Sequence, residues 1–325
     1  MSSIITNSAA TAALSTLRSI NSDLGRTQER VTTGYRVGSA SDDAAYWSIA
    51  RTMKSDDKAM SAVQDALGLG AATVDIAYNG LAASIDVVDD IKAKLVAASE
   101  PGVDKSKVNK ELTQLKDQLQ AIAKSSTFNN VNWLNITDAT DSSVQVVGSF
   151  VRDAARNVSM QTIDFDIYAN AGSGNMLALI DDRNSATGGE AGILTSTYFA
   201  TEAGAASNWV LHVNQSNSAT ATEIELSDAT TSDDLEDMVS VVDKMLLQLT
   251  NAGADYGALK MRVDLQTEFV SDLRDWASQG ISKLIDASMD EEATRLKALQ
   301  TQQQLTTQAL SIANSGPSAL LQLFQ

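Results

Sequence analysis

Two segments far apart in the chain carry long heptad seams, in which apolar or small residues recur at alternating spacings of three and four. The first seam contains Met60, Val63, Leu67, Gly70, Val74, Ala77, Leu81, Ser84, Val88, Ile91, Leu95 and Ala98. The second contains Met238, Val242, Met245, Leu249, Ala252, Tyr256, Leu259, Val263, Gln266, Val270, Leu273, Ala277, Gly280 and Leu284. Such spacing turns one stripe of a helix toward a partner helix, so it predicts a coiled coil of two long helices. At roughly 1.5 Å per residue each would be on the order of 60 Å long, which favours an elongated rod.

Shorter amphipathic segments lie outside the two seams, at residues 9–31 and 288–313. Their apolar residues are again three and four apart, which predicts one helix near each end of the chain. We expect Ser41 to cap the first long helix and Pro317 to end the last helix near Ala313. The mirrored order of short and long helices brings the chain ends together, so the two terminal helices are predicted to pair.

The apolar period changes between the seams. A third helix, capped by Asp104, is predicted to end soon after Ile122, and Asn129-Asn130 then form a pair able to take positive φ in a turn. Residues 137–234 are rich in Ser, Thr, Asn, Gly and Ala and contain short alternating pieces, which indicate a small β domain on the outside of the molecule.

The predicted fold class is therefore mainly α with a β-rich insert, built as an elongated coiled-coil rod with paired termini. We divide the chain into three parts: residues 1–41 with 287–325 (terminal helices and linker), residues 42–134 with 235–286 (rod), and residues 135–234 (outer variable domain).

Composition excludes several classes of function. With 24 basic and 41 acidic residues the net charge is −17, so phosphate backbones and anionic membranes would repel the surface, and we expect neither nucleic-acid nor membrane binding. No apolar run approaches the roughly 20 residues that span a bilayer, and the amino terminus does not resemble a cleaved signal peptide. The chain has no cysteine, so disulfides and thiolate chemistry are excluded.

Nothing in the sequence indicates catalysis. No nucleophile elbow, phosphate loop or dinucleotide fingerprint occurs, and the paired carboxylates are those of an acidic surface. His212 is the only histidine, and we expect it on a strand face rather than in a metal site. We therefore predict no catalytic residue, no cofactor and no metal.

The terminal helices are poor in large apolar groups. Ala, Thr and Gln occupy positions on their seams, and a pair of about 25 residues each buries too little to offset an ordering entropy of about 1 to 2 kcal/mol per residue. We expect both termini to be disordered in an isolated subunit and to become helical when neighbouring copies surround them.

Two separated motifs resemble the signatures of bacterial flagellins. Residues 30–45 read RVTTGYRVGSASDDAA, similar to the amino-terminal signature, and residues 305–314 read LTTQALSIAN, followed by LLQLF at 320–324, similar to the carboxy-terminal one. The resemblance covers roughly residues 1–134 and 235–325. It implies a subunit of the flagellar filament whose paired termini line an inner tube, whose long helices form an outer tube and whose middle faces solvent.

The resemblance also implies where subunits touch. The residues that we assign to subunit contacts and polymerisation are Leu17, Ile20, Leu24, Arg30, Gly34, Arg36, Ala40, Asp42, Asp43, Leu305, Leu310, Ile312, Leu320 and Phe324.

The implied partners are other copies of the chain, related flagellins, the flagellar export apparatus, an export chaperone, the filament cap and the hook-associated proteins, with an extracellular location in the filament. Vertebrate innate receptors often recognise the family near positions 88–96, through a basic residue and a following leucine. Asp90 and Lys94 stand at those places here, so weak receptor recognition is expected. A hook–filament junction protein with similar ends and an elongated surface adhesin remain as alternatives.

Overall fold

The computed structural model describes residues 7–137, 144–153, 155, 157–167, 176–183, 191–214, 217 and 219–322, the side chains of 316–322 excepted. Its helices are α1 (Ser8–Thr33), α2 (Ala44–Ala98), α3 (Lys105–Ser125), α4 (Tyr198–Ala203), α5 (Ser232–Ile285) and α6 (Met289–Gln322). Its strands are β1 (Thr127–Phe128), β2 (Val131–Asn132), β3 (Asn135–Ile136), β4 (Val144–Arg152), β5 (Val158–Phe165), β6 (Ile180–Asp181), β7 (Trp209–Val210) and β8 (Thr222–Glu223).

The chain divides into two compact units. The terminal unit comprises Met1–Ala59 and Leu273–Gln325, and the central unit comprises Met60–Asp272. Helices α2 and α5 contribute residues to both units. The predicted class, mainly helical with strands inserted in the middle, is confirmed.

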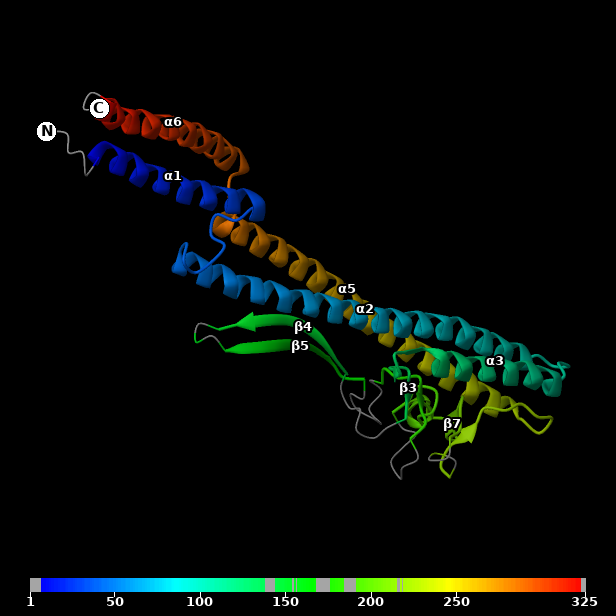
Figure 1. The fold of residues 1–325 in the computed structure, drawn as a ribbon. Coiled ribbons are helices and arrows are strands. Elements are labelled where there is room, and N and C mark those ends of the chain that lie inside the picture. Colours follow the sequence, from blue (N-terminus) through cyan, green and yellow to red (C-terminus); the bar gives the residue numbers. More distant parts are fainter. Residues whose placement is uncertain are drawn as a thin grey trace. The chain divides into compact units, whose positions relative to one another are not determined.

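The two predicted seams form the core of the central unit. From Met60 to Ala98 every residue of the first seam is buried except Gly70, and from Met238 to Val270 every residue of the second is buried except Gln266. Ion pairs join Asp75 to Lys260 and Lys92 to Asp243, so α2 and α5 are antiparallel (Figure 1). Each large apolar side chain that the seams bury contributes about 1.5 to 3 kcal/mol, so this helix pair is a large source of stability in the unit.

Helix α3 begins and ends as its sequence predicts. The Asp104 carboxylate accepts a hydrogen bond from the Lys107 N–H at 3.2 Å, which caps the helix. The hairpin of β1 and β2 follows, turning through Asn129 at φ 48° and Asn130 at φ 64°. Two successive left-handed residues characterise the tight turns that match the twist of paired strands, and asparagine tolerates this conformation better than most residues do.

The insert holds the predicted strands in short pairs. Strands β4 and β5 are antiparallel, with an irregularity between Val147 and Ser149, while β3 with β6 and β7 with β8 form short parallel pairs. His212 follows β7 instead of lying in it, so the expected strand position is wrong. Its Nε2 lies 3.2 Å from Gln120 Nε2, and burial lowers the pKa of the imidazole.

The start of α2 differs from the prediction. The helix begins at Ala44, so its cap is Asp43, whose Oδ1 accepts hydrogen bonds from the N–H groups of Ala45 and Tyr46 at 3.0 and 3.1 Å. Ser41, which was expected to cap it, instead places its hydroxyl 2.7 Å from that of Ser39 in the preceding loop.

The end of α6 also differs. The helix continues through Pro317 to Gln322 instead of ending near Ala313. Proline has no N–H to donate to the carbonyl four residues earlier, which is that of Ala313. The Asn7 side chain donates to this carbonyl at 2.8 Å, so the hydrogen bond that proline removes is replaced from α1's cap.

Two glycines of α2 let neighbouring elements approach the helix. A Cβ on Gly70 would collide with Val146 of β4, and one on Gly80 would collide with Ser126 and Leu134. Gly68, on the same helix, has no such neighbour within 4 Å. The conformational cost of glycine inside a helix is therefore offset at Gly70 and Gly80 by close packing.

We predict that Gly80→Ala lowers the stability of the protein by about 1 to 3 kcal/mol, because the added methyl group overpacks the contact with Leu134. Gly68→Ala is the matched control, and it is expected to raise stability by up to about 1 kcal/mol through helix propensity. Urea unfolding followed by circular dichroism measures both. Equal effects of the two substitutions would show that the close approach at Gly80 has no energetic role.

Candidate polymerisation interface

The terminal helices α1 and α6 lie side by side and antiparallel (Figure 1). Three polar contacts mark the length of the pair: Asn7 with Ala313, Asn21 with Gln303 at 2.7 Å, and Arg30 with Glu292. The predicted pairing of the terminal segments is confirmed.

The apolar content of this pair is small. On α1 only Ile20 and Thr27 are buried, and on the described part of α6 only Leu299 and Glu292 are. By comparison the seams of the central unit bury an apolar residue at nearly every turn. A pair with so few buried apolar groups gains little from the hydrophobic effect, which is the physical basis for expecting further packing from other copies.

Arg30 and Glu292 form the one ion pair between α1 and α6 among the described residues. Glu292 is buried, and its Oε1 lies 3.2 Å from Arg30 Nη1, while its Oε2 is buried without a hydrogen-bond partner. A buried carboxylate with an unsatisfied oxygen is costly, and the contact with Arg30 offsets part of that cost.

The linker after α1 is held to the connection between α5 and α6. Gly34 ends α1 in the left-handed conformation at φ 76°, and its N–H donates to the Arg30 carbonyl at 2.8 Å. Its carbonyl accepts from the Ala287 N–H at 2.8 Å, and the Arg36 N–H donates to the Ile285 carbonyl at 2.6 Å. The Arg36 guanidinium also donates to the Leu284 carbonyl at 2.7 Å. These bonds fix the two connecting segments to each other.

A small core lies beneath the linker. Val37, Ala50, Ile281 and Ile285 are buried together, with Met53 and Leu284 packed against them. Val37 belongs to the linker, so its side chain anchors this segment on the adjoining turns of α2 and α5.

Asp42 organises the loop before α2. Its Oδ2 accepts hydrogen bonds from the N–H groups of Gly38 and Ser39 and from the Ser39 hydroxyl, at 2.9 to 3.1 Å. These donors, the Ser39 N–H first among them, stabilise the charged carboxylate and lower the pKa of Asp42 below its usual value near 3.8. Asp42 thus shapes the loop while Asp43 caps the helix that follows.

The structure brings most of the sequence-predicted site residues into the terminal unit's helix pair and linker. Ile20 is buried; Leu17, Leu24, Arg30, Gly34, Asp43 and Leu310 are half-buried; Arg36, Ala40, Asp42, Leu305 and Ile312 are exposed. Leu320 lies in α6 but its side chain is outside the described set, and Phe324 lies outside the described residues altogether. Their role in contacts between copies remains a prediction.

Sequence reasoning missed three residues that hold this region together: Asn7, Val37 and Glu292. Asn7 carried a readable signal, because asparagine immediately before an amphipathic helix favours an N-cap, and its Oδ1 does accept from the Ala10 N–H at 3.1 Å. Glu292 carried none, since acidic residues in a first helical turn are ordinarily exposed.

Two further observations bear on the class of protein. Within the described ranges, no three His, Cys, Asp or Glu side chains are grouped closely enough to hold a metal ion. None of the helices that the structure describes is both long and apolar enough to span a bilayer. Paired long helices with thinly packed terminal helices define a class of helical assembly proteins.

Comparison with known proteins identifies the family. Residues 4–139 match the model of the bacterial flagellin N-terminal helical region, and residues 239–324 match that of the C-terminal helical region. The chain is 49% identical over 331 residues to Flagellin C of Rhizobium meliloti (strain 1021), with both chains covered completely. Flagellin A of the same strain is 42% identical over 402 residues and a flagellin of Brucella melitensis 37% over 330, again with full coverage of both chains.

The chain belongs to the bacterial flagellin family. It is a structural subunit that polymerises with copies of itself into the extracellular filament of the flagellum. The resemblance of its two terminal motifs to flagellin signatures is thereby confirmed, and the junction-protein alternative is not favoured.

Lowering the pH tests the role of Asp42. Because the folded-state pKa lies below the unfolded value near 3.8, the carboxylate stabilises the loop above that pH and its contribution is lost as the pH falls through the folded pKa. We expect the amide resonances of Gly38 and Ser39 to titrate together with a midpoint below 3.8. In Asp42→Asn this titration should disappear, whereas a midpoint at or above 3.8 in the parent protein would contradict the assignment.

Proposed function

We propose that copies of this chain assemble by covering one another's exposed apolar side chains, with the terminal helices on the inside of the filament wall. The observation that carries the proposal is on α6, where Leu305 and Ile312 remain 59% and 72% exposed although the helix is already packed on α1. The two residues are seven apart and so share one face of the helix. An apolar face of this kind, left open by the helix pair, is suited to another helix.

The central unit supplies a second surface of the same type. Met261, Leu265 and Phe269 recur at four-residue spacing on α5 and are each more than half exposed, on a different face from the seam residues Val263 and Val270. Large apolar groups in a row are unusual on the surface of a monomeric protein and mark interaction sites. This stripe supports contacts between copies along the long helices as well as along the termini.

The three-part division of the chain extends this proposal to the filament. Residues 1–41 with 287–325 would line the inner tube, residues 42–134 with 235–286 would form the outer tube, and residues 135–234 would face solvent. The two family models leave residues 140–238 unmatched, which supports a variable outer segment there.

The remaining partners follow from the same proposal. The chain would pass through the flagellar export apparatus with an export chaperone, and would meet the filament cap, the hook-associated proteins and related flagellins at the filament. It would act without catalysis. Recognition by vertebrate innate receptors would be weak, because Asp90 and Lys94 stand where a basic residue and a leucine are usual.

Leu305→Ser with Ile312→Ser tests the α6 face. Burial of each leucine or isoleucine contributes about 1.5 to 3 kcal/mol, so losing both should raise the critical concentration for growth on sheared filament seeds by at least tenfold. Gln302→Ser with Gln308→Ser, at exposed polar positions of the same helix, is the matched control and should leave growth unchanged. Growth of the leucine–isoleucine variant at the parental concentration would remove the proposed role of this face.

Hydrogen exchange tests whether assembly orders the termini. The pair of α1 and α6 buries few apolar groups, so its amides should exchange rapidly in the purified monomer and slowly in the filament. The seam segments of α2 and α5 serve as the internal reference and should be protected in both states. Strong protection of residues 9–31 in the monomer would show that the pair is stable without neighbours.

A further inference from the structure

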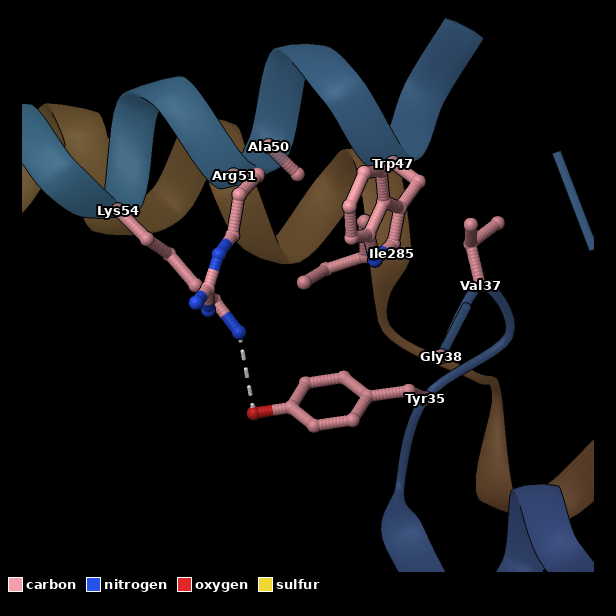
Figure 2. Close-up of a pocket in the computed structure, with 8 residues that line it drawn as sticks. All are labelled: Tyr35, Val37, Gly38, Trp47, Ala50, Arg51, Lys54 and Ile285. Atoms are coloured by element: carbon pink, nitrogen blue, oxygen red, sulfur yellow. Dashed lines mark hydrogen bonds between the residues drawn. The ribbon is translucent and has the colours of Figure 1, made fainter. Parts of the chain in front are cut away.

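A pocket of about 230 Å³ lies beside the linker in the terminal unit (Figure 2). Its walls are Tyr35, Val37 and Gly38 from the linker, Trp47, Ala50, Arg51 and Lys54 from α2, and Ile285 from the end of α5. We call this pocket the linker socket. None of the residues assigned to subunit contacts from the sequence lines it.

The linker socket combines an apolar wall with two cations. Val37, Ala50 and Ile285 are buried members of the small core, and the indole of Trp47 lies above Ile285 in Figure 2. Arg51 and Lys54 extend from α2 on the side of the Tyr35 ring. Lys54 Nζ lies 4.4 Å from the centroid of that ring and donates to the Tyr35 hydroxyl at 3.3 Å, which holds the ammonium group at the mouth.

No carboxylate in the part of the chain that the structure describes pairs with either cation. Among the described residues neither Arg51 nor Lys54 forms an ion pair, whereas Lys92, Lys260 and Arg274 on the long helices each pair with an aspartate of the facing helix. Other exposed cations of the described helices, such as Lys58, Arg262 and Lys283, form no ion pair either, so the distinguishing feature of Arg51 and Lys54 is that they lie together beside a hollow. In a chain with 41 acidic residues for 24 basic ones, two positive charges in such a place suit a negative group.

The size of the socket selects the kind of group. Pockets for organic ligands and cofactors usually measure about 300 to 1,000 Å³, so this one is small for them and suits a single side chain. A glutamate or aspartate would place its methylene groups against the apolar wall and its carboxylate at Arg51, whose planar guanidinium can hold two oxygens at once.

We propose that the linker socket receives an acidic side chain from the surface of a second copy of this chain. This inference rests on the proposed mode of assembly and names one of its contacts. Copies with a net charge of −17 repel one another, so close packing requires local points where an acidic surface meets positive charge. The socket provides such a point next to the linker that joins α1 to α2.

Arg51→Gln tests the proposal in the full-length protein. Arg51 is exposed and makes no ion pair with described residues, so the variant should fold as the parent does. We expect the critical concentration for growth on filament seeds to rise about tenfold, and its dependence on NaCl concentration to weaken. Lys58→Gln, which removes an exposed charge about two turns further along α2 and outside the socket, is the matched control and should change growth less than twofold. Arg51→Lys keeps the charge but loses the two-oxygen contact, so it should recover only part of the parental growth.

Cross-linking identifies the occupant. A carbodiimide joins amines to carboxylates without a spacer, and it is applied to filaments grown from a mixture of ¹⁴N and ¹⁵N subunits. It should link Lys54 to an aspartate or glutamate. A link between two copies is recognised by a cross-linked peptide pair in which one peptide carries ¹⁴N and the other ¹⁵N. Equal growth of Arg51→Gln and Lys58→Gln would overturn the proposal. So would saturable binding of inorganic phosphate at Trp47 in the monomer with unchanged assembly, since the occupant would then be a free anion. Failure of the parent protein to grow on seeds would instead contradict the proposed mode of assembly itself.

Discussion

Antiparallel packing of narrow apolar stripes is the interaction on which the rest of this structure depends. In the central unit the stripes of α2 and α5 are buried almost without interruption, and glycines at Gly70 and Gly80 admit other elements onto α2. In the terminal unit the same arrangement joins α1 to α6, but with few buried apolar side chains. One packing mode thus occurs with a heavily buried stripe in the central unit and a thinly buried one in the terminal unit, and the proposed assembly would complete the second.

The parts of the fold that were predicted from the sequence are those set by local periodicity. The three–four spacing identified the helices and their buried faces, and the Asn129-Asn130 pair identified the turn between β1 and β2. The signatures in residues 30–45 and 305–314 pointed to the family because they depend on residue order alone. Each of these features is determined by residues close together in the sequence, so the local pattern was sufficient to predict it.

Contacts between distant segments were not predictable in this way. Asn7 and Ala313 are 306 positions apart, and Arg30 and Glu292 are 262 apart, so no local pattern relates them. The end of α6 was predicted wrongly for this reason. The rule that proline stops a helix assumes that no other donor bonds to the carbonyl four residues earlier, but the Asn7 side chain donates to that carbonyl here. The start of α2 was predicted wrongly for a local reason, because Ser41, Asp42 and Asp43 are all good caps. In the structure Asp42 accepts from the N–H groups of Gly38 and Ser39, and Asp43 accepts from that of Tyr46.

The distribution of positive charge separates folding from assembly. An ion pair between two helices adds little to stability when solvent reaches it. Lys92–Asp243 and Lys260–Asp75 therefore mainly fix the register and direction of α2 against α5. Arg51 and Lys54 do no such work within the described chain, and a net negative surface keeps free copies apart. In the proposed assembly Arg51 and Lys54 would act between copies, beside the linker that joins α1 to α2.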